Sequence, residues 1–173
     1  MRPNWERWAE TLVTGASKFG SYVLIPALIA VSIYDIVGRQ FFNTGSTQLQ
    51  ELEWHFFFAV VMLGLGSTYL QDRHVRIDVI SSRLSPKTRA WIELTGYVLL
   101  VIPFSLLLIR FGGESAWDAW ISNERARAAL GLPYRWVIKT ALPIGGLLMG
   151  IAGTVVCWQS IQVIRGNRDR AQL

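Results

Sequence analysis

The chain of 173 residues is too apolar to be an ordinary soluble domain of its length. Hydrophobic residues make up 51% of it and charged residues only 17%, and its mean hydropathy is +0.32. The single cysteine, Cys157, excludes an internal disulfide. The formal net charge of +5 is explained more simply by positive residues that fix the topology of a membrane protein than by nucleic-acid binding.

Four separated apolar blocks have about the 20 residues that a helix needs to cross a bilayer. They are Ser21–Val37, Leu52–Leu70, Ala90–Phe111 and Val137–Ile161. None shows the alternation of a barrel strand. We therefore expect an all-α membrane protein in which residues 1–173 form a single membrane domain with four transmembrane helices. The first block lacks the cleavage site of a signal peptide, so we expect it to be retained.

The distribution of Lys and Arg predicts the orientation. These residues are concentrated in both tails and in the second connection, whereas the first connection contains only Arg39. Because positive residues favour the cytoplasmic side, both termini are predicted to be cytoplasmic. The N-terminal tail with Trp5 and Trp8 fits either a short helix on the inner surface or a loose tail.

The connections contain start signals for helices. Ser46 or Thr47 can cap a helix that begins at the outer surface and runs into the second block. Ser85 followed by Pro86 predicts the start of the third helix. Residues 116–128 are compatible with a second short interfacial helix in an outer connection. Kinks are expected at the prolines inside the blocks, which are Pro26, Pro103 and Pro143.

Ionisable residues inside a bilayer usually mark function, but here none lies at the centre of a block. Those at or near the outer ends are Asp35, Arg39, Glu51, Glu53, His55, Arg110, Glu114 and Lys139. Asp35 and Arg39 are four residues apart and predict an ion pair on one helix. Because an ion-coupled carrier places its binding groups near the midplane, we interpret the outer charges as ion pairs, snorkelling side chains or contacts with another protein.

Small residues in the second and fourth blocks predict close helix packing. Gly146 and Gly150 are four residues apart, and Gly64 and Gly66 have a similar role in the second block. These glycines allow packing within the four helices or a seat for a partner helix. We expect Leu at Gly146 or Gly150 to weaken assembly.

Catalysis and metal binding are poorly supported. His55 and His74 are the only histidines, and His74 lies in the inner connection, where it cannot face His55 across a haem. Glu51 and His55 could supply two metal ligands, but no third ligand is evident. We therefore expect no enzymatic activity, no cofactor and no metal.

Short motifs follow one another at the edges of the blocks. They are Gly38–Asn43, Gln50–His55, His74–Asp78 and Gly131–Trp136. Their order on a four-span chain resembles the small integral-membrane subunit, of the DctQ type, of tripartite ATP-independent periplasmic (TRAP) transporters. The segment Ser46–Trp54 is similar to the mannitol/chloroaromatic branch, whose members are linked more often to 2-oxo acids and other monocarboxylates than to sialic acid.

The resemblance implies a small subunit in the bacterial inner membrane that braces a large, sodium-coupled membrane subunit (DctM type). A periplasmic solute-binding protein (DctP type) would deliver an organic acid. The residues expected at the partner interface are Arg39, Glu51, Glu53, His55, Gly64, Lys139, Gly146 and Gly150. Two alternatives stay open, namely a stand-alone proton-coupled exporter that works as a homo-oligomer through Asp35 or Glu53, and an anchor subunit of a redox complex.

Overall fold

The computed structural model describes residues 3–42, 46–71, 84–125 and 131–166, and all regular structure within these ranges is helical. Three helical stretches are long and apolar enough to cross a membrane, and they are Asn4–Phe42, Lys87–Ile121 and Trp136–Ile164. Helix α3 (Thr47–Leu70) has 24 residues, but it is not apolar enough to be one of these three stretches. The prediction of four spans is thus confirmed for three, and the fourth stays a prediction.

The first stretch is one continuous helix in three parts. It consists of α1 (Asn4–Phe19), a π-helical turn η1 (Gly20–Leu24) and α2 (Ile25–Phe42). In α1 the buried residues Glu6, Ala9 and Val13 recur at helical spacing and face the bundle. The tail before the first predicted span is therefore helical, and the alternative of a loose tail is wrong. The buried face of α1 packs on α3 and on α8 (Ala141–Ile164).

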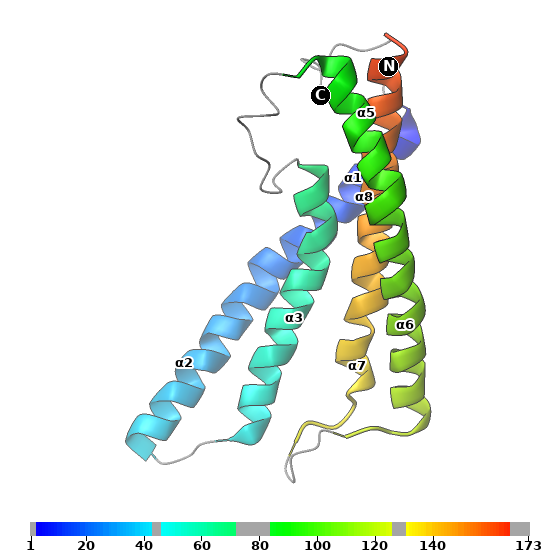
Figure 1. The fold of residues 1–173 in the computed structure, drawn as a ribbon. Helices are drawn as coiled ribbons and strands as arrows, with labels where there is room; N and C mark the ends of the chain where they lie inside the picture. Colours follow the sequence, from blue (N-terminus) through cyan, green and yellow to red (C-terminus); the bar gives the residue numbers. More distant parts are fainter. Residues whose placement is uncertain (1–2, 43–45, 72–83, 126–130, 167–173) are drawn as a thin grey trace.

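The remaining helices alternate in direction along the molecule (Figure 1). They are α3, then α5 (Pro86–Gly96) with η2 (Tyr97–Val101) and α6 (Ile102–Ile121), then α7 (Trp136–Lys139) and α8 (Ala141–Ile164). Residues 116–121 belong to the end of α6. The separate interfacial helix predicted there is therefore wrong as far as Ile121, and Ala128 lies outside the described residues. The apolar block ends before the helix does because backbone hydrogen bonding continues past the hydrocarbon layer.

Two serines were predicted as possible helix caps, and the structure shows a capping hydrogen bond at one of them. Ser85 caps α5, because its Oγ accepts a hydrogen bond from the backbone N–H of Thr88 at 3.2 Å and Pro86 occupies the first helical position. Ser46 occupies the same position before α3, but its side chain makes no capping hydrogen bond. Helix α3 nonetheless begins at Thr47 and continues into the bundle, as predicted.

Each proline inside an apolar block coincides with a departure from regular α-helix. The N–H of Ile25, just before Pro26, donates to the carbonyl of Gly20, five residues earlier. Before Pro103 the N–H of Ile102 likewise donates to the carbonyl of Tyr97. Proline clashes with the carbonyl four residues before it and cannot donate, so a widened π turn accommodates the ring. Near Pro143 the helix is interrupted at Thr140, between α7 and α8.

Helix α8 is the centre of the fold. Its Leu148 and Ala152 form a buried core with Val13 of α1, and apolar side chains of α3 pack around this core. On its other side α8 packs against α5, η2 and α6. By contrast, α2 buries only Asp35 and Gly38. The bundle is therefore organised around α8, with α2 at its edge.

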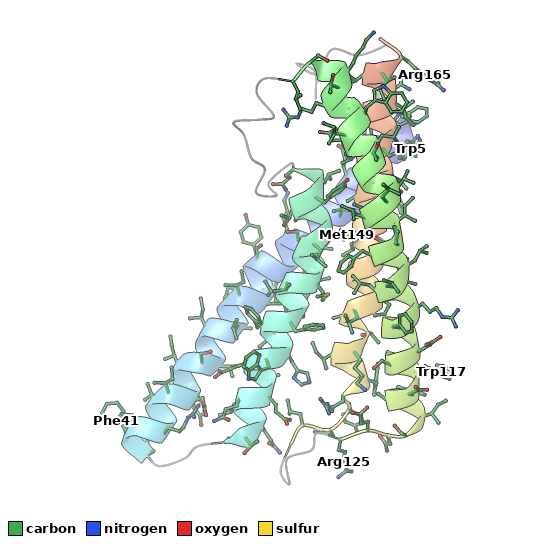
Figure 2. All side chains as sticks on the ribbon, in the orientation of Figure 1. Trp5, Phe41, Trp117, Arg125, Met149 and Arg165 are labelled. Atoms are coloured by element: carbon green, nitrogen blue, oxygen red, sulfur yellow. The ribbon has the colours of Figure 1, made fainter. Side chains whose placement is uncertain are left out.

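The two ends of the molecule differ. At the end that we call the terminal end, the start of α1 meets the end of α8, where Trp5 and Trp158 pack edge to face with ring centroids 5.9 Å apart. The Nε2 of Gln159 also donates to Glu6 at 2.8 Å there. At the opposite end, the far end, α2 and α3 diverge from α6 and α7 (Figure 1). Phe41 and Trp117 point away from the bundle near that end (Figure 2).

Candidate functional site

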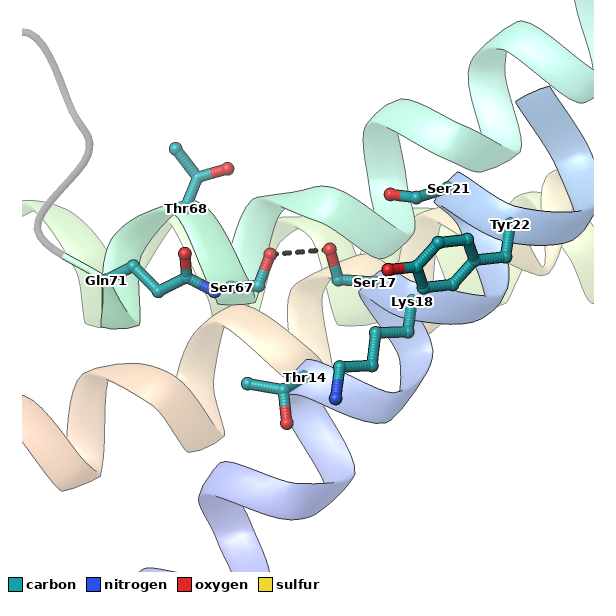
Figure 3. Close-up of a pocket in the computed structure, with 8 residues that line it drawn as sticks. All are labelled: Thr14, Ser17, Lys18, Ser21, Tyr22, Ser67, Thr68 and Gln71. Carbon is teal, nitrogen blue, oxygen red and sulfur yellow. Dashed lines mark hydrogen bonds between the residues drawn. The ribbon is translucent and has the colours of Figure 1, made fainter.

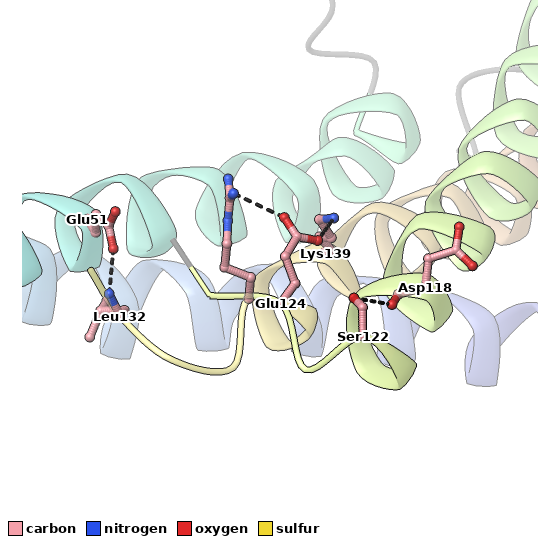
Figure 4. A network of polar contacts seen from close by, with 7 residues as sticks. Glu51, Asp118, Ser122, Glu124, Leu132 and Lys139 are labelled. Atoms are coloured by element: carbon pink, nitrogen blue, oxygen red, sulfur yellow. Dashed lines mark hydrogen bonds and ion pairs between the residues drawn. The ribbon is translucent and has the colours of Figure 1, made fainter. Parts of the chain in front are cut away.

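A network of polar contacts ties the connection after α6 to the helices at the far end (Figure 4). Helix α6 ends in a Schellman motif, in which the N–H of Asn123 donates to Trp120 and that of Glu124 to Ala119. Asn123 adopts the left-handed conformation, with φ of 50°, which asparagine tolerates better than most residues. The motif reverses the chain and places Glu124 next to α7.

Glu124 is the centre of this far-end network. Its Oε1 accepts a hydrogen bond from Arg135 Nη1 at 3.1 Å, and its Oε2 accepts one from Lys139 Nζ at 2.5 Å. All three side chains are about one quarter to one third exposed. Charge-assisted hydrogen bonds of this kind are stronger than neutral ones. Lys139, predicted as a partner contact, is thus held by an acidic residue of its own chain.

Glu51 fastens the same connection to α3. Its Oε2 accepts a hydrogen bond from the backbone N–H of Leu132 at 2.6 Å. One turn later, Nδ1 of His55 lies 2.5 Å from the backbone carbonyl oxygen of Glu51. Both predicted residues therefore belong to the far-end layer, and Glu51 holds the connection after α6 against α3.

Asp35 and Arg39 form the predicted ion pair on α2. Asp35 is 1% exposed, and the amide oxygen of Gln50, when it faces the guanidinium, accepts from Arg39 Nη1 at 2.7 Å. Arg39 therefore bridges α2 and the start of α3. Oδ1 of Asp35 and Oε1 of Glu53 are buried without a hydrogen-bond partner among the described residues.

A small groove opens between α3 and the start of the last helical stretch. Its volume is about 290 Å³, and it is lined by Trp54, His55, Phe58, Ile138, Lys139 and Leu142. Its walls are mainly apolar, with one histidine and one lysine among them. The groove therefore brings together His55 and Lys139, which are 84 positions apart in the sequence.

The glycines fall into two groups when a Cβ is built at each. At Gly66 it would lie 2.7 Å from the carbonyl oxygen of Leu148, and at Gly146 it would lie 2.8 Å from Cβ of Leu108. At Gly150 it would make an ordinary contact of 3.8 Å with Ser105, and at Gly64 it would meet nothing within 4 Å. Gly146 thus packs within the chain, which favours the packing alternative, whereas Gly64 lies on an open face.

Gly64 continues an apolar stripe on α3. Trp54, Phe57 and Val61 are all exposed on this stripe, and the four residues lie within about 80° of one another around a helix of 3.6 residues per turn. The rings of Trp54 and Phe57 pack edge to face. We call these residues the α3 stripe. Its glycine would let the backbone of another helix approach closely.

Sequence reasoning missed several residues that the fold uses. Glu124 was not proposed as a contact, although Arg135 and Lys139 are four residues apart and so face one side of the next helix. Gly112 was also missed, and a Cβ there would lie 2.7 Å from Cβ of Leu142. Within the described ranges, no three His, Cys, Asp or Glu side chains are grouped to hold a metal, and His74 lies outside those ranges.

These features define a class of helical membrane protein. The middle of each of the four apolar blocks contains no charged residue, the core is made by close helix packing, and the far end carries a fixed polar layer.

Residues 28–163 match the family model described as "Tripartite ATP-independent periplasmic transporters, DctQ component". The chain belongs to this family, as its motifs predicted.

One curated relative is the sialic acid TRAP transporter permease protein SiaT of Haemophilus influenzae (strain 86-028NP). It is 30% identical over 126 residues, which are 73% of this chain and 20% of the relative. The chain therefore spans about one fifth of the length of that permease. The mannitol/chloroaromatic branch stays a prediction.

Proposed function

We propose that the chain is the small permease subunit that braces the large, sodium-coupled carrier subunit of a TRAP transporter. The observation that carries this proposal is the family match over residues 28–163. In the proposed setting the chain crosses the bacterial inner membrane four times with both termini in the cytoplasm, and α3 is the fourth span. The far end then faces the periplasm, where a solute-binding protein delivers an organic acid.

The layout of the chain supports a bracing role. The middle of each of the four predicted spans contains no charged side chain that could bind an ion or solute at mid-membrane. Tight contacts at Gly66, Gly146 and Gly153 fix α8 between its neighbours. A rigid helical unit with apolar outer faces can support a neighbouring carrier without taking part in transport chemistry.

The α3 stripe is the surface that we assign to the large subunit. Its aromatic residues and Gly64 offer an apolar seat that no other described helix of the chain covers. One transmembrane helix of the carrier is the proposed occupant. The far-end residues Arg39, Glu51, Glu53, His55 and Lys139 are proposed to contact the partner on the periplasmic side, whereas Gly146 and Gly150 face Ser105 of α6 and pack within the chain.

The proposal is tested by Gly64→Leu. A Cβ at this position meets nothing within 4 Å in the chain itself, so the chain is expected to fold while the leucine blocks the approach of a partner helix. Affinity-tagged wild-type chain, extracted in mild detergent, is expected to retain a much larger membrane protein, and Gly64→Leu to retain severalfold less. Gly113→Leu is the matched control, because Gly113 is equally open but lies on α6. Equal recovery in both variants would contradict the assignment of the stripe.

One observation favours the alternative of a proton-coupled exporter, because Asp35 and Glu53 each have a buried carboxylate oxygen without a partner among the described residues. The purified chain in liposomes separates the two functions. A brace moves no solute alone, whereas an exporter gives flux that Glu53→Gln abolishes. Flux from the pure chain would overturn the proposal.

Docking of the binding protein and the choice of solute are tested in the assembled transporter. Glu114 and Arg125 lie exposed toward the far end, and reversing either charge is expected to alter uptake without lowering the amount of the subunit. Reversal at Lys87, which is exposed near the terminal end, is the control. Because the relative is named for sialic acid and the sequence resembles a branch linked to 2-oxo acids, uptake of both acids should be compared.

A further inference from the structure

A polar pocket lies between the first long helix and the end of α3 (Figure 3). Its volume is about 430 Å³, and it is lined by Thr14, Ser17, Lys18, Ser21, Tyr22, Ser67, Thr68 and Gln71. The lining contains one cationic side chain and no carboxylate. This pocket is separate from the far-end network and from the α3 stripe, and the bracing role does not use it.

The helices form the pocket by regular spacing. The residues from α1 and η1 stand at positions i, i+3, i+4, i+7 and i+8, which is one face of a helix. Those from α3 stand at i, i+1 and i+4. The neighbouring residues Phe19 and Val23 are exposed and apolar. Polar faces of two helices therefore meet on an otherwise apolar surface.

The hydroxyl groups of the pocket are only partly used by the protein. Oγ of Ser67 lies 2.8 Å from Oγ of Ser17 and 3.1 Å from the carbonyl oxygen of Gly64, so Ser17 and Ser67 form a hydroxyl pair within the protein. The hydroxyls of Thr14 and Thr68 donate to backbone carbonyls within their own helices. Among the described residues, the hydroxyl groups of the pocket that have no such bond are therefore those of Ser21 and Tyr22.

Further donors have no acceptor in the part of the chain that is described. Lys18 is exposed and makes no ion pair there, and the side chains of Ser21, Tyr22 and Gln71 make no hydrogen bond there. An ammonium group is donor-only, and a phosphate ester is acceptor-only with a negative charge. The pocket therefore matches a phosphate in both charge and hydrogen bonding.

The level of the pocket relative to the predicted bilayer indicates which molecule carries that phosphate. The first predicted span begins at Ser21 and the second ends at Leu70, so both inner boundaries of the hydrocarbon layer fall at the pocket. The continuous helix Asn4–Phe42 has 39 residues and is about 58 Å long at 1.5 Å per residue, whereas the hydrocarbon core is about 30 Å thick. The helix thus extends beyond the core, and Lys18 lies at headgroup level.

We propose that this pocket binds the headgroup phosphate of an anionic phospholipid of the cytoplasmic leaflet. Lys18 supplies the opposite charge, and Ser21 and Tyr22 supply hydrogen bonds. The acyl chains lie along the exposed apolar side chains near Val23. The proposal depends on the placement of the chain in the membrane and not on its role as a brace.

The experiment measures lipid retained by the full-length chain in mild detergent, using native mass spectrometry with added phosphatidylglycerol or phosphatidylcholine. The wild type is expected to retain phosphatidylglycerol preferentially. Lys18→Gln is expected to lower its apparent affinity about fivefold, the factor that corresponds to about 1 kcal/mol for one basic residue at an anionic surface. Lys18→Arg is expected to keep it. Lys87→Gln is the matched control, because Lys87 is also exposed but lines no such pocket.

The other outcomes reject the proposal. Equal retention of the two lipids, or equal losses in Lys18→Gln and Lys87→Gln, would show that Lys18 is an ordinary surface charge. Displacement of phosphatidylglycerol by millimolar inorganic phosphate would identify a site for free phosphate. Unchanged lipid binding in Lys18→Gln together with reduced recovery of the larger membrane protein would assign the pocket to a protein contact.

Discussion

The substitution Gly66→Ala is the most direct test of the packing around α8. An added Cβ at Gly66 would lie 2.7 Å from the carbonyl oxygen and 2.9 Å from the carbonyl carbon of Leu148. These are backbone atoms, so no side-chain rotation relieves the contact. The comparison variant is Gly64→Ala on the same helix, two residues away, where a Cβ meets nothing within 4 Å.

The magnitude follows from the geometry. To reach an ordinary contact of 3.4 Å, α3 and α8 must separate by about 0.7 Å, and gaps of about 0.5–1 Å forfeit a quarter to a half of each dispersion contact. Overpacking of this kind costs about 1–3 kcal/mol. Both substitutions gain the same helix propensity, up to about 1 kcal/mol, so that gain cancels in the comparison. The two variants should therefore differ by the overpacking cost alone, about 1–3 kcal/mol.

Cys157 provides the assay, because it is the only thiol in the chain and lies partly buried in α8. Thermal unfolding in detergent can be followed by its labelling with a thiol-reactive dye. For chains of 150–250 residues, 1 kcal/mol shifts Tm by about 2–4 °C, so Gly66→Ala should melt at least about 2 °C below Gly64→Ala. Equal melting temperatures would refute the close approach of α3 and α8.

Three further predictions use the same unfolding assay. Glu124→Gln should lower the free energy of unfolding by about 1–2 kcal/mol, because it weakens two charge-assisted hydrogen bonds that are only partly exposed. Glu114→Gln, in a more exposed ion pair, should lower it by less than about 0.5 kcal/mol. The reverse order would contradict the far-end network. Asn123→Val should cost about 1–2 kcal/mol because of its left-handed backbone, while Asn123→Gly should be tolerated, and equal stability of the two would exclude that backbone. Ser85→Ala should cost about 1 kcal/mol through loss of its cap, and Ser46→Ala, which removes no capping bond, should cost little; equal losses would argue against the cap at Ser85.

Hydropathy located the apolar helices because burial in hydrocarbon needs a long apolar run, which a linear sequence displays. The cap at Ser85 could also be predicted, since it joins residues three positions apart. The full length of α1 could not be recognised from hydropathy, because this helix is amphipathic and only one of its faces packs on α3 and α8. Its spacing of Ala9 and Val13 was a weaker signal that becomes informative only when those partners are known.

The sequence predicted at which end of the molecule the site residues lie, but it did not predict their individual contacts. The sequence placed Glu51, Lys139 and Arg39 in one outer layer. It could not show that Glu51 binds the backbone of Leu132, 81 positions away, because this contact depends on how the helices are rotated. The same rotation determines that neighbouring helices lie against Gly66 and Gly146, whereas no other part of the described chain lies against Gly64.

The π turns also determine where the chain can change its length. Each π turn contains one residue more than an α turn. The helix segments before and after it keep the relative orientation that they would have in an α-helix without that extra residue. Removing one residue from Gly20–Leu24, with Pro26 replaced by Ala so that no ring needs the wider turn, would leave Val13 and Asp35 directed to their present neighbours. The same deletion in the middle of α3, which has no such turn, would rotate everything beyond it by about 100°. Evolutionary insertions and deletions of single residues in these helices should therefore occur together with the gain or loss of the prolines at positions 26 and 103.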